Sequence, residues 1–152
     1  MADYKTISLS FDGAVATLTL SREEALNALS FEVMREVMSA LNAVQANSEC
    51  SVLVLEGSGR AFSVGFDLHA LAGMMMGGNL PSERQLKEAA QLGEDMVRQL
   101  RALDVVTIAS VHGYAIGGGF LLMSVCDFRV VEDGTVFSIP EVDMGIPLLW
   151  GG

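Results

Sequence analysis

Three consecutive glycines, Gly117 to Gly119, stand directly in front of a solidly apolar run within the segment His112–Phe128. Glycine adds backbone freedom that is lost on folding, at a cost in free energy. We therefore expect three consecutive glycines to have a role that offsets this cost. The triplet falls where a predicted strand meets a predicted helix, and the first N–H groups of a helix are unpaired and partly positive. An anion or a developing oxyanion could therefore approach the N–H of Gly118, because no β-carbon blocks it.

Two other roles for the glycine triplet are a phosphate-binding loop and close packing of a helix on a strand. A dinucleotide-binding loop would need a glycine at Leu122 after Gly117 and Gly119, and no Gly-Lys-Ser/Thr follows, so the spacing excludes both phosphate loops. Tight packing of a helix against a strand would also favour glycine. The triplet by itself leaves packing and ligand binding open.

A second junction of the same kind occurs at GRAFSVGFDL, Gly59–Leu68, which again follows a predicted buried strand. It places Gly65 just before Phe66. Two such loops can aim two backbone N–H groups at one oxygen atom. The pair of junctions therefore favours ligand binding over packing alone.

The elements that must position these loops begin with a hairpin and a helix. The Asp12-Gly13 turn signal precedes the β-rich run Val15–Leu20, which predicts an opening hairpin. Ser30 is a plausible N-cap of the next helix, and Leu29 and Met34 stand where a hydrophobic staple would. The apolar positions of this helix repeat at helical spacing at Met34, Val37, Met38, Leu41 and Val44.

Strands and helices then alternate along the chain. The Met-rich stretch Gly73–Asn79 is predicted to be a loop rather than a mobile lid, and Pro81 fits the first turn of a second helix. The apolar face of that helix carries Leu86, Ala90, Met96, Leu100 and Leu103. Further strands are predicted at Ser51–Leu55, Val105–Val111 and Phe128–Val131, and a buried helix at Gly118–Cys126. This alternation predicts an α/β fold with buried strands.

Composition and charge exclude several classes of function. A chain of 152 residues with 51% hydrophobic and 18% charged residues is predicted to form one globular domain, residues 1–152. The net charge of -10, without any cluster of Lys and Arg, argues against nucleic acid and anionic membranes as partners. The first residues lack a signal-peptide pattern, so we expect a cytoplasmic protein. Cys50 and Cys126 have no metal-ligand spacing, so we expect buried free thiols and no metal site.

One segment could be mistaken for a membrane span. Val105–Cys126 contains no Asp, Glu, Lys or Arg and is long enough to cross a bilayer. Its four glycines and its His, Ser and Thr residues are better explained by a strand, a turn and a buried helix laid end to end. We therefore expect no membrane-spanning segment here.

Taken together, five motifs resemble the crotonase superfamily, the enoyl-CoA hydratase/isomerase family. The first four follow one another along most of the chain, and the fifth lies near its end. They are Glu24–Leu29, Ala61–Leu68, Gly113–Gly119, Cys126-Asp127, and Pro140-Glu141 followed by Gly145-Ile146-Pro147. Each motif is weak alone, but their order and spacing are specific. The resemblance implies a crotonase-like (ClpP/crotonase) α/β fold, a ββα spiral core.

The resemblance also implies an acyl-CoA thioester as the substrate, with coenzyme A as part of that substrate and no separate cofactor. Two backbone N–H groups, those of Phe66 and Gly118, would hold the enolate oxygen of the thioester as an oxyanion hole. The segment around Ala25 and the Phe66–His69 loop would line the adenine and pantetheine. The residues carried over as substrate-binding are Ala25, Ser63, Gly65, Asp67, Leu68, His69 and Gly117.

Relatives use up to two carboxylates for proton transfer, and one of them maps to Glu141. The other maps to Leu121, where a hydratase would have an acid. Adding water needs two groups, whereas moving a proton between the α- and γ-carbons needs one carboxylate acting first as base and then as acid. The resemblance therefore favours double-bond isomerisation with Glu141 as the catalytic residue. The dienoyl type is less favoured, because its acids map to Leu121 and Leu149.

Other polar residues are assigned structural roles. Asp67 and Asp127 are expected to accept hydrogen bonds from backbone N–H groups, and His112 to be a structural donor near a strand end. His69 could face the CoA channel without a catalytic role.

The last residues, Trp150 to Gly152, fall in the middle of the family pattern. Relatives continue into a helical part that completes the CoA pocket and builds a trimer or hexamer. We therefore expect either a fragment or a natural short form, an uncovered surface, and self-association into a homo-oligomer or a partner chain.

The sequence leaves three alternatives open. Enoyl-CoA hydration is the second enzymatic hypothesis. A catalytically silent acyl-CoA-binding or assembly subunit would explain the missing carboxylate and the short chain. A generic α/β domain with packing glycines would bind no acyl-CoA at all.

Overall fold

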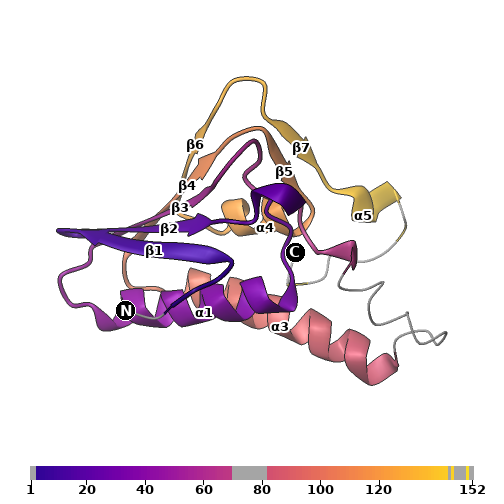
Figure 1. Cartoon of the computed structure of the whole chain (residues 1–152), viewed down its shortest axis with the longest axis horizontal. Coiled ribbons are helices and arrows are strands. Elements are labelled where there is room, and N and C mark those ends of the chain that lie inside the picture. The colour runs from indigo at the N-terminus through magenta and orange to yellow at the C-terminus, as the bar shows by residue number, and fades with distance from the viewer. Residues whose placement is uncertain (1–2, 70–81, 144, 146–149, 151–152) are drawn as a thin grey trace.

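The computed structural model describes residues 3–69, 82–143, 145 and 150, and it contains a layered arrangement of strands and helices (Figure 1). The strands are β1 (Ile7–Asp12), β2 (Val15–Leu20), β3 (Val52–Gly57), β4 (Val106–Val111), β5 (Tyr114–Ile116), β6 (Phe128–Val131) and β7 (Val136–Ser138). The helices are α1 (Phe31–Ala46), α3 (Glu83–Arg101), α4 (Gly118–Ser124) and α5 (Pro140–Asp143), with a 3-10 turn η1 (Glu23–Ala25).

Five strands form the main sheet in the order β1-β2-β3-β4-β6. The predicted hairpin is confirmed, because β1 and β2 pair antiparallel, and the remaining neighbours pair parallel. Strands β2 and β4 bury every second residue from Ala16 and Thr107 onward. Strands β5 and β7 form a separate parallel pair, which places the end of β5 beside the chain segment that leads into α5.

Helices α1 and α3 pack on each other and lie along one face of the sheet (Figure 1). The predicted cap is confirmed, since Ser30 Oγ accepts a hydrogen bond from the N–H of Val33 at 3.3 Å. Leu29 and Met34, the two residues of the predicted staple, are both fully buried. Aliphatic and Met side chains make up most of the core, among them Leu18, Leu41, Leu53, Leu55, Met96 and Leu100.

The segment 105–126 contains two strands and a short helix, β4, β5 and α4. In the described part of the chain, no helix is long and apolar enough to span a membrane. The predicted boundaries are corrected by a few residues: β4 begins at Val106, and α4 ends at Ser124, not at Cys126. Strands β5 and β7 were missed because each has only three residues, too few to show a period. The loop predicted at Gly73–Asn79 and the helix start predicted at Pro81 lie outside the described residues.

Both cysteines are free and buried, as predicted. Burial raises the pKa of the Cys126 thiol to about 11, so this group stays protonated at neutral pH.

Candidate functional site

The two glycine loops predicted to act together lie against each other in the structure. Ser63 and Ala115 form an isolated parallel bridge between them. The N–H of Ser63 donates to the carbonyl oxygen of Tyr114 at 3.0 Å, and the N–H of Ile116 donates to the carbonyl oxygen of Ser63 at 3.0 Å. These bonds place the Gly65-Phe66 turn beside the start of α4.

Gly65 is one of the positions where the two loops approach each other closely. Its φ is +83°, a left-handed conformation that favours glycine. A β-carbon at this position would lie 2.6 Å from the carbonyl oxygen of Ile116 and 2.9 Å from the nitrogen of Gly118. Any larger residue at position 65 would therefore cover the N–H of Gly118.

The two N–H groups predicted to form the oxyanion hole share one property in the described part of the chain: neither has a hydrogen-bond acceptor. No described residue accepts a hydrogen bond from the N–H of Phe66 or of Gly118. One neighbouring N–H group on each loop is bonded within the protein: Asp67 N–H donates to the Leu29 carbonyl, and Gly117 N–H donates to the Ser138 carbonyl. The geometry suits an oxygen acceptor shared by the two loops, and the catalytic role of the pair stays a prediction.

A buried amide, which the sequence interpretation did not single out, holds the Phe66 loop in place. Asn27 is only 1% exposed, and its Nδ2 donates to the carbonyl oxygens of Ser58 and Ala61, each at 2.8 Å. Its Oδ1 accepts from the N–H of Arg22, and its carbonyl accepts from Ser63 Oγ, both at 2.8 Å. The available sequence signal was an Asn directly after the turn at Glu24–Leu26, since Asn tolerates the left-handed φ of 55° found here.

An ion pair ties the same loop to the segment before α1. Arg22 Nη1 donates to Asp67 Oδ2 at 2.8 Å and to the Ala28 carbonyl at 2.9 Å. Asp67 Oδ1 accepts from the N–H of His69 at 3.0 Å, which confirms that Asp67 binds backbone N–H groups. Asp67 is 5% exposed, so its charge is balanced by Arg22 largely out of contact with water.

Glu141 lies against Gly117, at the start of α4, although it belongs to α5, which follows β7 in the sequence. A β-carbon on Gly117 would lie 2.7 Å from Glu141 Oε1, so the carboxylate packs directly on the residue before Gly118. Gly117 has φ +51° and ψ -117°, a conformation that glycine adopts at little cost. Glu141 Oε2 is buried and has no hydrogen-bond partner among the described residues. A buried unpaired carboxylate oxygen is costly for stability, which is typical of a functional group that awaits a ligand.

The position predicted to lack a second acid is apolar and buried. Leu121 is 8% exposed and lies in the first turn of α4, with its N–H bonded to the Gly117 carbonyl. Leu149, the other position compared with an acid, lies outside the described residues.

The remaining predicted site residues are distributed around this centre. Ser63 is fully buried, and its Oγ accepts a hydrogen bond from the N–H of Gly65 at 3.2 Å. Ala25 ends the η1 turn, while Leu68 and His69 are exposed just beyond Asp67. His112 Nε2 lies 2.9 Å from the Gly59 carbonyl, an acceptor only, so Nε2 donates and the expected structural role is confirmed.

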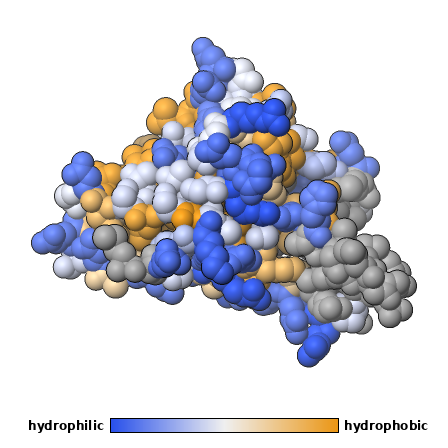
Figure 2. Space-filling model, in the orientation of Figure 1, coloured by the Kyte–Doolittle hydropathy of each residue, from blue (hydrophilic) through white to orange (hydrophobic). Residues whose placement is uncertain are grey.

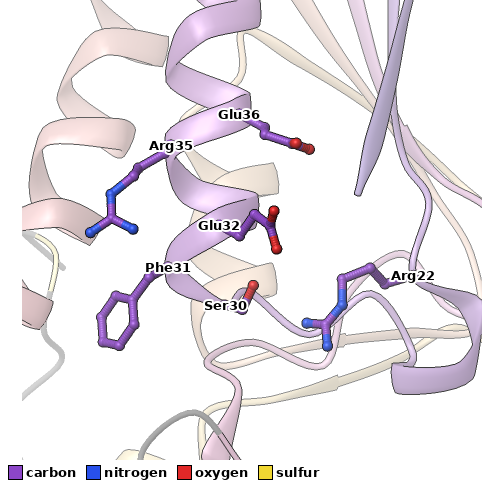
Figure 3. A pocket seen from close by; sticks show the side chains of 6 residues that line it. All are labelled: Arg22, Ser30, Phe31, Glu32, Arg35 and Glu36. Carbon is purple, nitrogen blue, oxygen red and sulfur yellow. The ribbon is translucent and has the colours of Figure 1, made fainter. Parts of the chain in front are cut away.

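An open groove of about 740 Å³ runs along the start of α1, next to this centre (Figure 3). Its lining consists of Arg22, Ser30, Phe31, Glu32, Arg35 and Glu36. The Phe31 ring packs edge-on to the Phe66 ring, with 5.8 Å between ring centres, so the groove adjoins the Phe66 loop. Its lining contains two arginines and two glutamates, so the groove has no net charge to select an anion.

The chain is similar to known proteins over nearly all of its length. The family model for enoyl-CoA hydratase/isomerase matches residues 10–151. Crotonyl-CoA hydratase of Syntrophomonas wolfei is 32% identical over 150 residues, which are 98% of this chain and 55% of the relative. The peroxisomal Delta(3,5)-Delta(2,4)-dienoyl-CoA isomerase of Arabidopsis thaliana is also 32% identical, over 96% of this chain and 55% of its own length.

Solved structures show the same similarity. The enoyl-CoA hydratase of Bacillus anthracis superposes with a TM-score of 0.88 at 28% identity, covering 97% of this chain and 55% of that one. The chain thus spans about half the length of the relatives it matches. The match over nearly all of the chain, with the same fold, shows that it is a member of the enoyl-CoA hydratase/isomerase family and has the crotonase fold.

Proposed function

We propose that this chain carries the enolate-binding and proton-transfer site of a 3-enoyl-CoA to 2-enoyl-CoA isomerase. Membership of the family supports an acyl-CoA thioester as the substrate. The N–H groups of Phe66 and Gly118 would donate to the thioester oxygen, and Ala25, Leu68 and His69 would lie along the CoA part. The exposure of Leu68 and His69 beside the Phe66 loop supports this placement.

The reaction needs one group that first removes and then returns a proton. The Glu141 carboxylate would take a proton from C2 of a 3-enoyl thioester, and the electron pair of that C–H bond would delocalise onto the thioester oxygen. The protonated Glu141 would then give its proton to C4, leaving the double bond between C2 and C3. The two N–H groups would stabilise the negative oxygen throughout, each contributing about 3–4 kcal/mol.

The single observation that carries the proposal is the carboxylate of Glu141. It packs on Gly117, next to the free N–H of Gly118, and its Oε2 is buried without a partner among the described residues. A carboxylate without a partner beside these N–H groups would be the base for a C–H group of a bound thioester.

Hydration is the second candidate, because hydratase names are common among the relatives. It would require a second group to orient water, and the apolar Leu121 favours isomerisation instead. A silent acyl-CoA-binding subunit is the third candidate and would bind substrate without turnover.

Replacing Glu141 by Gln tests the proposal. Glu141→Gln keeps the shape of the side chain and removes the base, so kcat for 3-enoyl-CoA is expected to fall by about 10²–10⁴-fold with little change in KM. Steady-state kinetics with 3-enoyl-CoA and 2-enoyl-CoA measure both reactions on the full chain.

Asp143→Asn is the matched control, since Asp143 is an exposed carboxylate of the same short helix. It should leave both parameters near their original values. Equal losses in the two variants, or hydration of 2-enoyl-CoA as the faster reaction, would overturn the isomerase assignment. Binding of acyl-CoA without any turnover would favour the silent subunit.

A further inference from the structure

Trp150 brings an aromatic ring to the proposed site from a distant part of the sequence. Its indole is 7% exposed and packs edge-on to the Phe66 ring, with 6.2 Å between ring centres and 73° between planes. A β-carbon on Gly118 would overlap the six-membered ring of this indole. The same ring therefore contacts both residues whose N–H groups have no acceptor in the described part of the chain.

The opposite edge of the indole meets α3. A β-carbon on Gly93 would overlap Nε1 of Trp150, so the ring spans the space between the middle of α3 and the start of α4. Two glycines thus accommodate one indole, which is held between two backbone segments. Trp150 itself has φ +76°, an unfavourable conformation for a bulky residue that costs about 1–3 kcal/mol and is common at ligand sites.

We propose that the indole of Trp150 is the wall that limits the acyl group, so that the site accepts short acyl thioesters and rejects long or aromatic ones. This inference rests on the proposed function, because it takes the thioester oxygen to lie between the N–H groups of Phe66 and Gly118. The acyl carbons are bonded to that same carbonyl carbon. They must therefore leave it within a few bond lengths of a ring that contacts both donor residues.

The selectivity should be measurable with a chain-length series. One methylene more or less in an apolar pocket changes kcat/KM by about 10–200-fold. Trp150→Ala removes the ring, so the kcat/KM ratio of 3-octenoyl-CoA to 3-butenoyl-CoA is expected to rise at least about tenfold. Trp150→Phe should give an intermediate ratio, and Phe11→Ala, which removes an exposed ring on β1, should leave the ratio unchanged.

Binding gives a readout that does not depend on turnover. Trp150 is the single tryptophan of the sequence, so intrinsic fluorescence reports on this ring alone. Butyryl-CoA should shift or quench the emission of the full chain, and free CoA should change it much less. Octanoyl-CoA should bind more weakly than butyryl-CoA in calorimetric titrations, and this order should reverse in Trp150→Ala.

The outcomes separate the inference from the proposed function. If the emission changes and the affinities follow the expected order, but no substrate is turned over, the limiting role of Trp150 is supported and the isomerase assignment is wrong. If turnover depends on Glu141, but ligands leave the emission unchanged and Trp150→Ala keeps the same chain-length preference, the limiting role of Trp150 is wrong. The isomerase assignment would then still stand.

Discussion

At the scale of single residues, the proposed site depends on glycines, because they have no side chain. Gly65 lets the two loops approach, Gly117 receives the carboxylate of Glu141, and Gly118 faces the ring of Trp150. Each of these contacts would be blocked by one methyl group. The conformational freedom that these glycines lose on folding is offset by the close approach that they permit.

Gly65→Ala should therefore damage activity more than stability alone can explain. Left-handed backbone costs an alanine about 1–2 kcal/mol. The added methyl would also press on the carbonyl oxygen of Ile116 and on the nitrogen of Gly118. Displacing one oxyanion donor reduces kcat by about 10²–10³-fold. Thermal unfolding and steady-state kinetics measure the two effects separately.

Gly134→Ala is a control with the same backbone strain, because Gly134 also has φ +83°, and a β-carbon there would meet no described atom within 4 Å. It should lose similar stability through strain and keep its kcat. A similar loss of kcat in both variants would show that Gly65 acts only through folding.

At the scale of elements, one cluster of hydrogen bonds fastens β4 to the end of α4. Asp127 Oδ2 accepts from the N–H of Thr107 at 2.8 Å and from its Oγ1 at 2.9 Å, and the N–H of Asp127 donates to Thr107 Oγ1 at 2.9 Å. The expected role of Asp127 as an acceptor of backbone N–H groups is thus confirmed. This cluster sets the position from which β6 pairs with β4.

The Asp127 cluster predicts a pH-dependent contribution to stability. The backbone and side-chain hydrogen bonds from Thr107 lower the pKa of the Asp127 carboxyl below its ordinary 3.8. Because the unfolded chain binds the proton more readily, the contribution is present above the unfolded pKa and is lost as pH falls through the folded pKa. Asp127→Asn should lower Tm at pH 7, and the difference from the original chain should shrink once the pH falls below the ordinary pKa of 3.8.

Asp133→Asn serves as the comparison, since Asp133 is an exposed carboxylate shortly after β6. Its Tm should follow that of the original chain over the whole pH range. A Tm difference for Asp127→Asn that stays constant between neutral pH and the acid limit would contradict the assigned protonation.

At the scale of the whole molecule, apolar side chains are exposed near one edge of the sheet. Strand β6 is the last strand of the main sheet, and Phe128 and Val130 on it are 60% and 66% exposed. Val136 and Phe137 on β7 are also exposed, and hydrophobic surface is visible on both flanks of the upper part of the molecule, below a hydrophilic tip (Figures 1 and 2). An edge strand with an apolar surface favours association with another chain.

We therefore expect the chain to self-associate through β6. Phe128→Lys combined with Val130→Lys should shift the sedimentation coefficient toward that of a monomer, because two buried charges would oppose the contact. Phe11→Lys is the control, since Phe11 is an exposed ring on β1 at the opposite edge of the sheet. A monomeric original chain at all concentrations, or the same shift in the control, would contradict this expectation.

The sequence by itself determined the features that depend on near neighbours. The hairpin at Asp12-Gly13, the Ser30 cap and the alternation of strands and helices follow from turn residues and periodicity within about ten positions. The order of the motifs was also sufficient to recognise the family. Strands β5 and β7 lacked such a signal, because a strand of three residues is too short to show a period.

The tertiary structure alone decided which residues meet. Asn27 reaches Ala61, Glu141 packs on Gly117, and Trp150 fills the space left by Gly93 and Gly118, at separations that no local pattern encodes. Such contacts depend on how the sheet and the helices bring distant loops to one point, and on which glycines leave room there. For that reason the family could be recognised from the sequence, whereas the shape of the site could not be predicted.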